Sequence, residues 1–103
     1  MDESKSSFTF DKLSKKNLFI SGKNMLQNFL NLPIDQHLRV LDLGCGTGDL
    51  TVWIANKYPK ARFDAIDPST DRIEFARKNN SSPRISYFVD DAISFLHVLQ
   101  HRS

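Results

Sequence analysis

Three short apolar runs, separated by two segments with helical periodicity, make up the centre of the chain. The runs are LRVLDL, RFDAID and RISYFV, at residues 38–43, 62–67 and 84–89. Each has the length of a strand: the first is nearly continuously apolar, as expected for a strand that is covered on both faces, and the third is β-branched and aromatic. The pattern therefore predicts three strands.

Two helices are predicted between these strands. The first begins at Asp49, whose charge favours a helix N-terminus, and it ends before Pro59. Its apolar residues share one face and are Leu50, Trp53, Ile54 and Tyr58. The second covers residues 69–80, opens with the capping sequence STD and carries Ile73 and Ala76 on one side.

The alternation of strands and helices with short links predicts the fold class. It indicates right-handed crossovers and a parallel sheet in which the strand order is third, second, first. Residues 92–103 are predicted to form one more helix, after which the chain stops. The expected fold is therefore α/β: a Rossmann-like, doubly wound parallel sheet, truncated after the third strand.

The first 37 residues differ in character and are predicted to form an N-terminal helical segment. Residues 1–11 are Ser-rich and charged, and we expect them to be poorly ordered. From Lys12 to Leu32 apolar residues recur at helical spacing, which predicts two helical pieces divided at Ser21-Gly22. The chain is thus divided into this segment, residues 1–37, and a partial domain, residues 38–103.

Length and composition limit the classes of protein that fit. The chain has 103 residues, is 40% hydrophobic and 25% charged, and carries a net charge of +2, as expected for a small globular domain. This modest charge does not support a dedicated nucleic-acid binder, although RNA is not excluded as a substrate. Cys45 is the only cysteine, and no apolar run has the length of a signal peptide or membrane helix. We therefore expect a cytoplasmic protein that does not enter a membrane.

The stretch VLDLGCGTGD places three glycines directly after the first predicted strand. Gly44, Gly46 and Gly48 then lie at the carboxyl end of a parallel strand, where α/β folds bind ligands. Alternating glycines indicate backbone angles, or a close approach of a ligand, that a Cβ atom would forbid. The glycines alone are equally compatible with a tight connection that binds nothing.

The spacing of the glycines and the charge around them restrict the ligand. The pattern is G-x-G-x-G rather than the G-x-G-x-x-G of dinucleotide folds, and no Gly-Lys-Ser/Thr is present to hold a triphosphate. Acidic residues surround the turn, namely Asp42, Asp49, Asp67 and Asp91. They disfavour a phosphate and favour a ligand with positive charge. Asp67 also follows Gly48 by about 20 positions, the spacing at which a carboxylate reaches ribose hydroxyls in the related dinucleotide fold.

Three motifs together resemble the class I S-adenosylmethionine-dependent methyltransferases. They are VLDLGCGTG, the acid that closes the second strand in DAIDPS, and the acid in FVDDA, so that the resemblance covers residues 38–92. It implies that the cofactor is S-adenosylmethionine and that the glycine turn lies under its methionine and ribose part. The residues implied for this contact are Asp42, Gly44, Cys45, Gly46 and Gly48.

The same resemblance assigns the remaining cofactor contacts. It implies that Asp67 binds the two ribose hydroxyls and that Asp91 and Ala92 meet the amino edge of the adenine, with Asp90 as the alternative to Asp91. A carboxylate accepts two hydrogen bonds at once, which suits a vicinal diol. The cofactor is cationic and has no phosphates, which suits the acidic surroundings. The competing interpretation is that these aspartates are solvated residues at strand ends.

The implied activity is transfer of a methyl group from the sulfonium to an O, N, S or C nucleophile, and we expect a small-molecule acceptor. No catalytic base is identified in the sequence, and Cys45 has no histidine or basic neighbour that would activate it. No metal site is expected, because the pair Asp90-Asp91 alone would hold magnesium poorly. The alternative is a catalytically inactive, truncated relative that binds the cofactor or serves as an interaction module.

The resemblance ends at a point with structural consequences. Members of the family normally continue with a fourth strand beside the first, and this chain stops before it. The first predicted strand is therefore expected to be an uncovered parallel edge. Such an edge would recruit another chain and form a homo- or hetero-oligomer.

Overall fold

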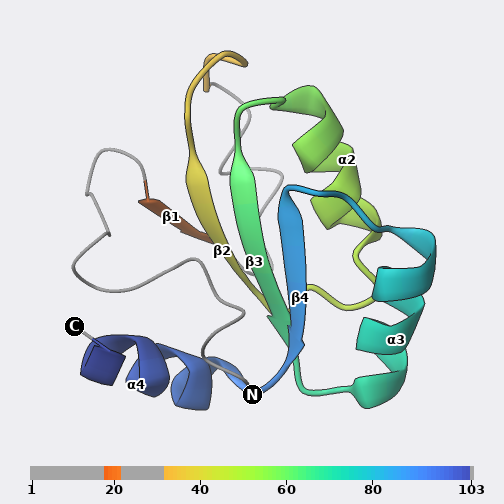
Figure 1. Cartoon of the computed structure of the whole chain (residues 1–103), viewed down its shortest axis with the longest axis vertical. Helices are drawn as coiled ribbons and strands as arrows, with labels where there is room; N and C mark the ends of the chain where they lie inside the picture. Colours follow the sequence, from red (N-terminus) through yellow and green to blue (C-terminus); the bar gives the residue numbers. More distant parts are fainter. Residues whose placement is uncertain (1–17, 22–31, 103) are drawn as a thin grey trace.

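The computed structural model describes residues 18–21 and 32–102, which form a parallel sheet with helices on both faces (Figure 1). The order of the strands in the sheet, β1-β2-β3-β4, follows their order along the chain. The elements are β1 (Leu18–Ser21), β2 (Arg39–Leu43), α2 (Asp49–Lys57), β3 (Arg62–Asp67), α3 (Thr70–Asn79), β4 (Ile85–Val89) and α4 (Ala92–Arg102).

The part of the fold that follows residue 38 confirms the predicted alternation. The three predicted strands are β2, β3 and β4, and their parallel pairing gives the predicted order third, second, first. The helices predicted after each of them are α2, α3 and α4. Short links between apolar strands and amphipathic helices were sufficient to predict this arrangement.

The N-terminal segment contains a correction. Residues 18–21 were expected to be helical, but they form the strand β1, which pairs in parallel with β2 from Leu18 opposite Arg39 to Ser21 opposite Asp42. Periodicity cannot distinguish a strand from a helix in so short an apolar run. Pairing with β2 favours the strand, because the backbone N–H and C=O groups along the edge of β2 gain hydrogen-bond partners when β1 is added.

The same pairing overturns a second expectation. The first predicted strand, β2, is not an uncovered edge, since β1 lies beside it (Figure 1). The predicted route to an oligomer through that edge is therefore wrong. Residues 32–37, the end of the predicted N-terminal helical segment, form bends and turns rather than a helix. The remaining residues assigned to the helical pieces, 12–17 and 22–31, and the poorly ordered start expected at residues 1–11 lie outside the described residues.

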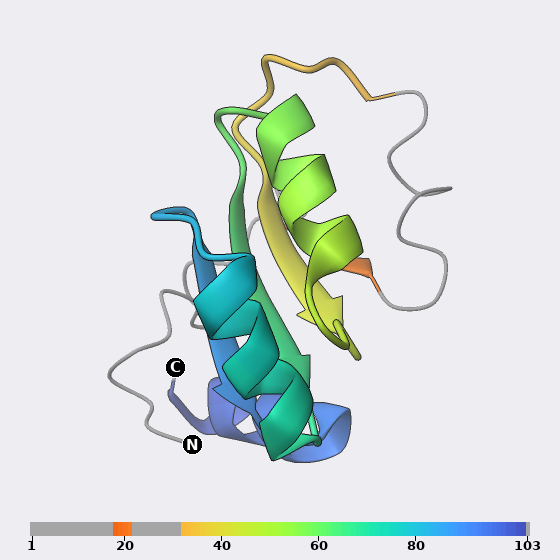
Figure 2. The same cartoon turned by 90° about the vertical axis from the view of Figure 1, so that its right-hand side faces the viewer.

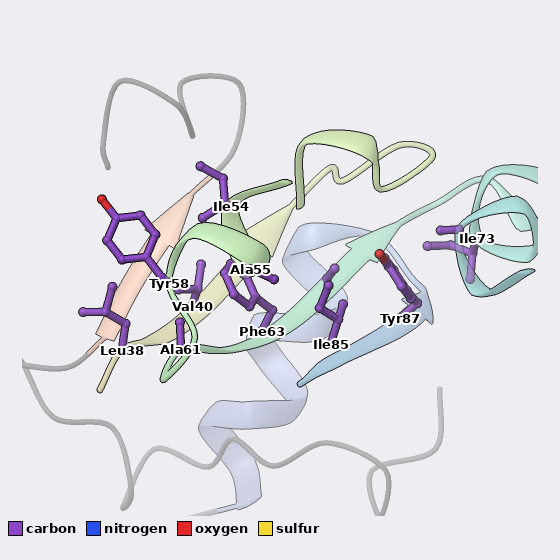
Figure 3. Close-up of a cluster of buried hydrophobic side chains, with 12 residues drawn as sticks. Leu38, Val40, Ile54, Ala55, Tyr58, Ala61, Phe63, Ile73, Ile85 and Tyr87 are labelled. Carbon is purple, nitrogen blue, oxygen red and sulfur yellow. The ribbon is translucent and has the colours of Figure 1, made fainter. Parts of the chain in front are cut away.

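The sheet separates two apolar layers. Helices α2 and α3 lie side by side over one face, and α4 lies on the other (Figure 2). Successive residues of each strand point to opposite faces. On the α2 and α3 side the buried cluster includes Val40, Phe63 and Tyr87 (Figure 3). On the α4 side Phe88 packs on Phe95, with ring centroids 5.8 Å apart.

The buried face of α2 differs from the predicted one. Ile54 is buried as expected, and Tyr58, just after the last helical residue, is buried as well, but Leu50 and Trp53 are 41% and 50% exposed. The helix instead buries Thr51, Ile54 and Ala55, a stripe rotated away from the expected apolar face. The indole of Trp53 lies under the Lys57 ammonium, 5.4 Å from the nitrogen to the ring centroid.

The predictions for α3 are confirmed. Ile73 and Ala76 are its buried residues, and the side chain of Ser69 caps its N-terminus by accepting the backbone N–H of Arg72.

No helix within residues 32–102 is both long and apolar enough to cross a membrane.

A single arginine fixes the C-terminal end of α2 to the sheet. The guanidinium of Arg84, just before β4, donates to the carbonyl oxygens of Ala55 at 2.7 Å, Ala61 at 2.8 Å and Tyr58 at 2.9 Å. The last carbonyls of a helix have no partner within the helix. Arg84 therefore satisfies groups at the amino edge of the sheet, opposite the glycine turn.

Candidate functional site

The glycine turn connects β2 to α2 at the carboxyl edge of the sheet. Gly44, Gly46 and Gly48 all have positive φ values, of 80°, 60° and 81°. Residues that carry a Cβ atom rarely adopt this left-handed backbone conformation, because the Cβ atom approaches the carbonyl oxygen too closely. All three positions therefore require glycine for the path of the backbone.

The surroundings of the glycines divide them into two kinds. A Cβ atom on Gly44 or Gly46 would meet no atom within 4 Å, so both residues border open space. A Cβ atom on Gly48 would lie 2.7 Å from the hydroxyl oxygen of Tyr87. One side of the turn is therefore packed against β4, while the other leaves room for a ligand.

The end of β3 holds the turn in place. The carbonyl oxygen of Ile66 accepts the N–H groups of Gly44 at 2.8 Å and Cys45 at 2.9 Å. Next to it, Oδ2 of Asp67 accepts the N–H of Gly46 at 2.9 Å. Gly46, in the turn after β2, and Asp67, the last residue of β3, are both predicted cofactor contacts, and they are thus hydrogen-bonded to each other.

Asp67 is a nearly buried carboxylate, 3% exposed, at the centre of this edge. Its Oδ1 atom accepts the N–H of Ser69 at 3.0 Å, which links it to the start of α3. The guanidinium of Arg72 lies 4.0 Å from Oδ2 and is largely exposed. Each carboxylate oxygen therefore has one strong backbone partner, and Arg72 lies close to Oδ2.

Asp42 lies in the core beneath the turn. It is 3% exposed, and its Oδ2 atom accepts the hydroxyl of the buried Thr51 at 2.6 Å. A buried carboxylate is tolerated when hydrogen bonds replace the water that it has lost. The pair joins the end of β2 to the first turn of α2, and so links the two ends of the glycine turn.

The carboxylates create a negative potential at the turn, and this potential affects the pKa of the Cys45 thiol. Burial raises the pKa of its thiol to about 12, and the charges of Asp42 and then Asp67 add to the effect. Burial also raises the pKa of the Tyr87 hydroxyl, again with contributions from nearby acids. At neutral pH both groups are uncharged, so Cys45 is a small, neutral residue between two glycines.

The acids after β4 lie at the same edge. The N–H of Asp90 donates to the carbonyl oxygen of Asp67 at 3.1 Å, and Oδ1 of Asp90 accepts the N–H of Asp91 at 2.9 Å. Asp91 caps α4: its carboxylate accepts the N–H of Ser94 at 2.8 Å and the hydroxyl of Ser94 at 2.9 Å. These bonds, the backbone one first, lower the pKa of Asp91.

Sequence reasoning missed one contact with the turn. The side-chain amide of Asn80, at the end of α3, donates to the carbonyl oxygen of Thr47 and to Oδ1 of Asp49, both at 2.8 Å. No motif marks this asparagine, because its role depends on where the end of α3 packs. Among residues 32–98, no three His, Cys, Asp or Glu side chains come together in a way that could hold a metal ion.

Similar proteins are methyltransferases. A family model described as a methyltransferase domain matches residues 40–101. The malonyl-[acyl-carrier protein] O-methyltransferase of Priestia megaterium is 41% identical over 64 residues, which are 62% of this chain and 22% of the relative. The ribosomal RNA large subunit methyltransferase G of Aliivibrio salmonicida is 46% identical over 50 residues, 48% of this chain and 13% of the relative.

Solved structures agree with these relatives. A putative S-adenosylmethionine-dependent methyltransferase from Listeria monocytogenes superposes with a TM-score of 0.51 at 30% identity, over 66% of this chain and 29% of the other. Coclaurine N-methyltransferase bound to N-methylheliamine and SAH gives a TM-score of 0.52 at 29% identity, over 65% and 21%. The chain spans about a fifth of the length of the curated relative from Priestia megaterium. The fold class and the family expected from the sequence are confirmed: the chain belongs to the methyltransferase domain family.

Proposed function

We propose that the glycine turn binds S-adenosylmethionine, and that the chain is the cofactor-binding part of a methyltransferase. One observation carries the proposal: Gly44 and Gly46 combine a positive φ with open space, while a nearly buried carboxylate, Asp67, holds the turn between them. The backbone is thus shaped around a volume that side chains do not enter. This fits a ligand that lies against the main chain.

The charge of the site fits this cofactor better than a nucleotide. The negative potential that raises the pKa of Cys45 comes from Asp42 and Asp67, after the larger effect of burial. It would repel a pyrophosphate and attract a cation. S-adenosylmethionine supplies a methyl group on a positively charged sulfonium and carries no phosphate. The contribution of the chain is to orient that group, which lowers the barrier to an in-line displacement.

We assign the ribose hydroxyls to Asp67. An ionised carboxylate offers about four acceptor positions, and the two backbone N–H donors leave further lone pairs for a diol. For the adenine edge we propose Asp91 and Ala92, with Asp90 as the alternative. The Asp91 carboxylate also caps α4, so the cap and the adenine contact would share its oxygens.

We propose a small molecule as the methyl acceptor. The net charge of +2 is low for a protein that holds a nucleic-acid backbone. Basic side chains do line a cavity near the start of β2 and β3, but this cavity is at the sheet edge opposite the glycine turn; they are His37, Arg39, Lys60 and Arg62. The relatives differ in the class of their methyl acceptor, since one acts on an acyl-carrier protein substrate and another on ribosomal RNA.

Calorimetry with S-adenosylhomocysteine tests the cofactor site without requiring an acceptor. The chain should bind this product, and Asp67→Asn should weaken binding at least about tenfold, because an amide keeps one acceptor but loses the charge. Asp71→Asn is the matched control, since it removes the same charge from an exposed position in the first turn of α3. Equal affinity in wild type and Asp67→Asn would contradict the residue assignment, and no binding by the wild type would contradict the proposed function.

Transfer of a radiolabelled methyl group tests the acceptor class. The chain is incubated with labelled S-adenosylmethionine and, separately, with a set of small carboxylates, amines and thiols and with total RNA. Label in a small molecule supports the proposal, and label in RNA alone overturns the small-molecule assignment. Binding of S-adenosylhomocysteine with no transfer to any acceptor would favour the alternative, a cofactor-binding module.

A further inference from the structure

The end of α3 makes a specific contact with the glycine turn. Asn80 follows the last residue of α3, and its Nδ2 atom lies 2.8 Å from the carbonyl oxygen of Thr47 and 2.8 Å from Oδ1 of Asp49. Thr47 stands between Gly46 and Gly48, so the first bond holds the backbone of the turn itself. The second holds the first residue of α2. One amide thus connects two points about 30 residues earlier in the chain.

Asn80 is held in place by its own backbone. Its N–H donates to the carbonyl oxygen of Ala76 at 2.8 Å, and its carbonyl oxygen accepts the hydroxyl of Tyr87 at 2.7 Å. Tyr87 is the residue that a Cβ atom on Gly48 would strike. The packed side of the turn therefore rests on two connected side chains, Asn80 and Tyr87.

Asp49 completes the network. Its Oδ1 atom accepts the Asn80 amide, and its Oδ2 atom accepts the hydroxyl of Thr47 at 3.1 Å. The bond from Asn80 is charge-assisted, which makes it stronger than a bond between neutral groups. Thr47, which has a glycine on each side, is consequently held through both its carbonyl oxygen and its hydroxyl.

A turn with three glycines loses much conformational entropy when it becomes ordered. If that loss occurred on binding, it would reduce the affinity for the ligand, whereas a turn that is ordered beforehand avoids it. We propose that Asn80 is a positioning residue for the methyl donor, because its side-chain amide holds the backbone of the glycine turn in the binding conformation before the donor arrives. The inference rests on the proposed function, since it takes the donor as the ligand of the turn.

The neighbouring residue provides a matched control. Asn79 is the last residue of α3, and its Nδ2 atom donates to the carbonyl oxygen of Phe75 at 3.0 Å, within the same helix. Asn79→Ala removes the same type of side chain as Asn80→Ala. Each variant loses one hydrogen bond to a backbone carbonyl, but the bond of Asn79 lies within α3. A difference between Asn80→Ala and Asn79→Ala therefore measures the contact with the turn rather than the stability of α3.

The test is calorimetry with S-adenosylhomocysteine on the wild type, Asn80→Ala and Asn79→Ala, with thermal unfolding to correct for the folded fraction. Asn80→Ala should bind about tenfold more weakly, which corresponds to about 1.4 kcal/mol. Without ligand, the amides of Gly46, Thr47 and Gly48 should exchange with solvent faster in this variant. Asn79→Ala should remain within about twofold of the wild type in affinity and leave those amides unchanged.

Two further variants test the hydrogen bonds themselves. Asn80→Asp keeps the shape of the side chain but removes its donors, so it should lose at least as much affinity as Asn80→Ala. Combining Asn80→Asp with Asp49→Asn should restore part of the affinity, because an amide at position 49 can donate to a carboxylate at position 80.

The outcomes separate the two proposals. If the wild type binds and Asn80→Ala binds equally well, or if Asn79→Ala loses as much affinity, the role of Asn80 is overturned and the proposed function stands. If the wild type does not bind, the proposed function fails and this inference fails with it.

Discussion

The two edges of the sheet use polar side chains in opposite ways. At the carboxyl edge, the hydrogen bonds of Asp67 and Asn80 converge on a glycine turn that borders open space. At the amino edge, Arg84 donates three bonds to carbonyl oxygens at the end of α2 and in the link to β3. The first arrangement fixes a backbone that faces open space, and the second stabilises the region where α2 ends and the link to β3 begins.

The amino edge also contains a cavity of about 180 Å³, lined by four basic side chains and Leu38. Two of these, Arg39 and Arg62, are opposite each other in the pairing of β2 with β3, so they project on the same face of the sheet. Positive φ values among the described residues are confined to the three glycines of the turn at the other edge, so the two edges differ in backbone conformation as well as in charge.

Alanine substitutions at two glycines give the largest expected effect and sharpen the comparison within the carboxyl edge. Gly48→Ala should lower the free energy of unfolding by about 3 kcal/mol, because the residue keeps a positive φ and its Cβ meets the Tyr87 hydroxyl at 2.7 Å. Gly46→Ala should lower it by only about 1 kcal/mol, because its Cβ meets no atom within 4 Å. Urea unfolding measures both.

Binding should show the reverse order. The methyl group of Gly46→Ala enters the space assigned to the cofactor, so affinity for S-adenosylhomocysteine should fall at least about tenfold per folded molecule. If Gly46→Ala destabilised the chain as much as Gly48→Ala and bound the ligand normally, the division of the turn into a packed side and a ligand side would be wrong.

Arg84→Met tests the amino edge and has the next largest effect. It removes three hydrogen bonds from a charged donor to the carbonyl oxygens of Ala55 in α2, its C-cap Tyr58 and Ala61 in the link to β3, while keeping most of the apolar stem. We expect a loss of about 2 kcal/mol in the free energy of unfolding, since the bonds are only partly buried. Affinity for S-adenosylhomocysteine, corrected for the folded fraction, should stay within about twofold.

The exposed Arg62 on the same edge serves as the control, and Arg62→Met should change stability by less than about 0.5 kcal/mol. A large loss of ligand affinity in Arg84→Met, with the fold intact, would show that the two edges are coupled and would break the comparison.

Local patterns in the sequence predicted the sheet from β2 onward, because short apolar runs alternate there with helical segments that have clear ends. They misassigned Leu18–Ser21, since a segment with only three consecutive apolar residues fits either a helix or a strand, and pairing with β2 decides between them. They also grouped Leu50 and Trp53 with Ile54 on one apolar face of α2, but both are exposed. The polar Thr51 is buried instead, because it donates to the buried Asp42.

The candidate site was predictable where the chemistry is continuous in the sequence. The glycine spacing and the acids at the strand ends identified the residues that the fold brings to one edge. Asn80 could not be found in this way, because its partners Thr47 and Asp49 lie about 30 positions away and it carries no motif. Likewise, only the packed structure shows that Tyr87, rather than a ligand, excludes a side chain from Gly48.

The smallest expected effect concerns the negative potential at the carboxyl edge, which Cys45 measures. Its thiol has a pKa of about 12, so alkylation by iodoacetamide should accelerate only as the pH approaches that value rather than near 9, where a free thiol ionises. The folded chain should also lose stability as the pH rises above 9, because the unfolded thiol releases its proton first. Asp42→Asn removes one of the charges responsible and should lower the pKa of Cys45, raising the alkylation rate at pH 10 on the order of threefold. Glu74→Gln removes a charge from the exposed surface of α3 and should leave the rate unchanged. Equal rates in the wild type and Asp42→Asn would show that burial alone protects the thiol, and the electrostatic argument for a cationic ligand would lose its support.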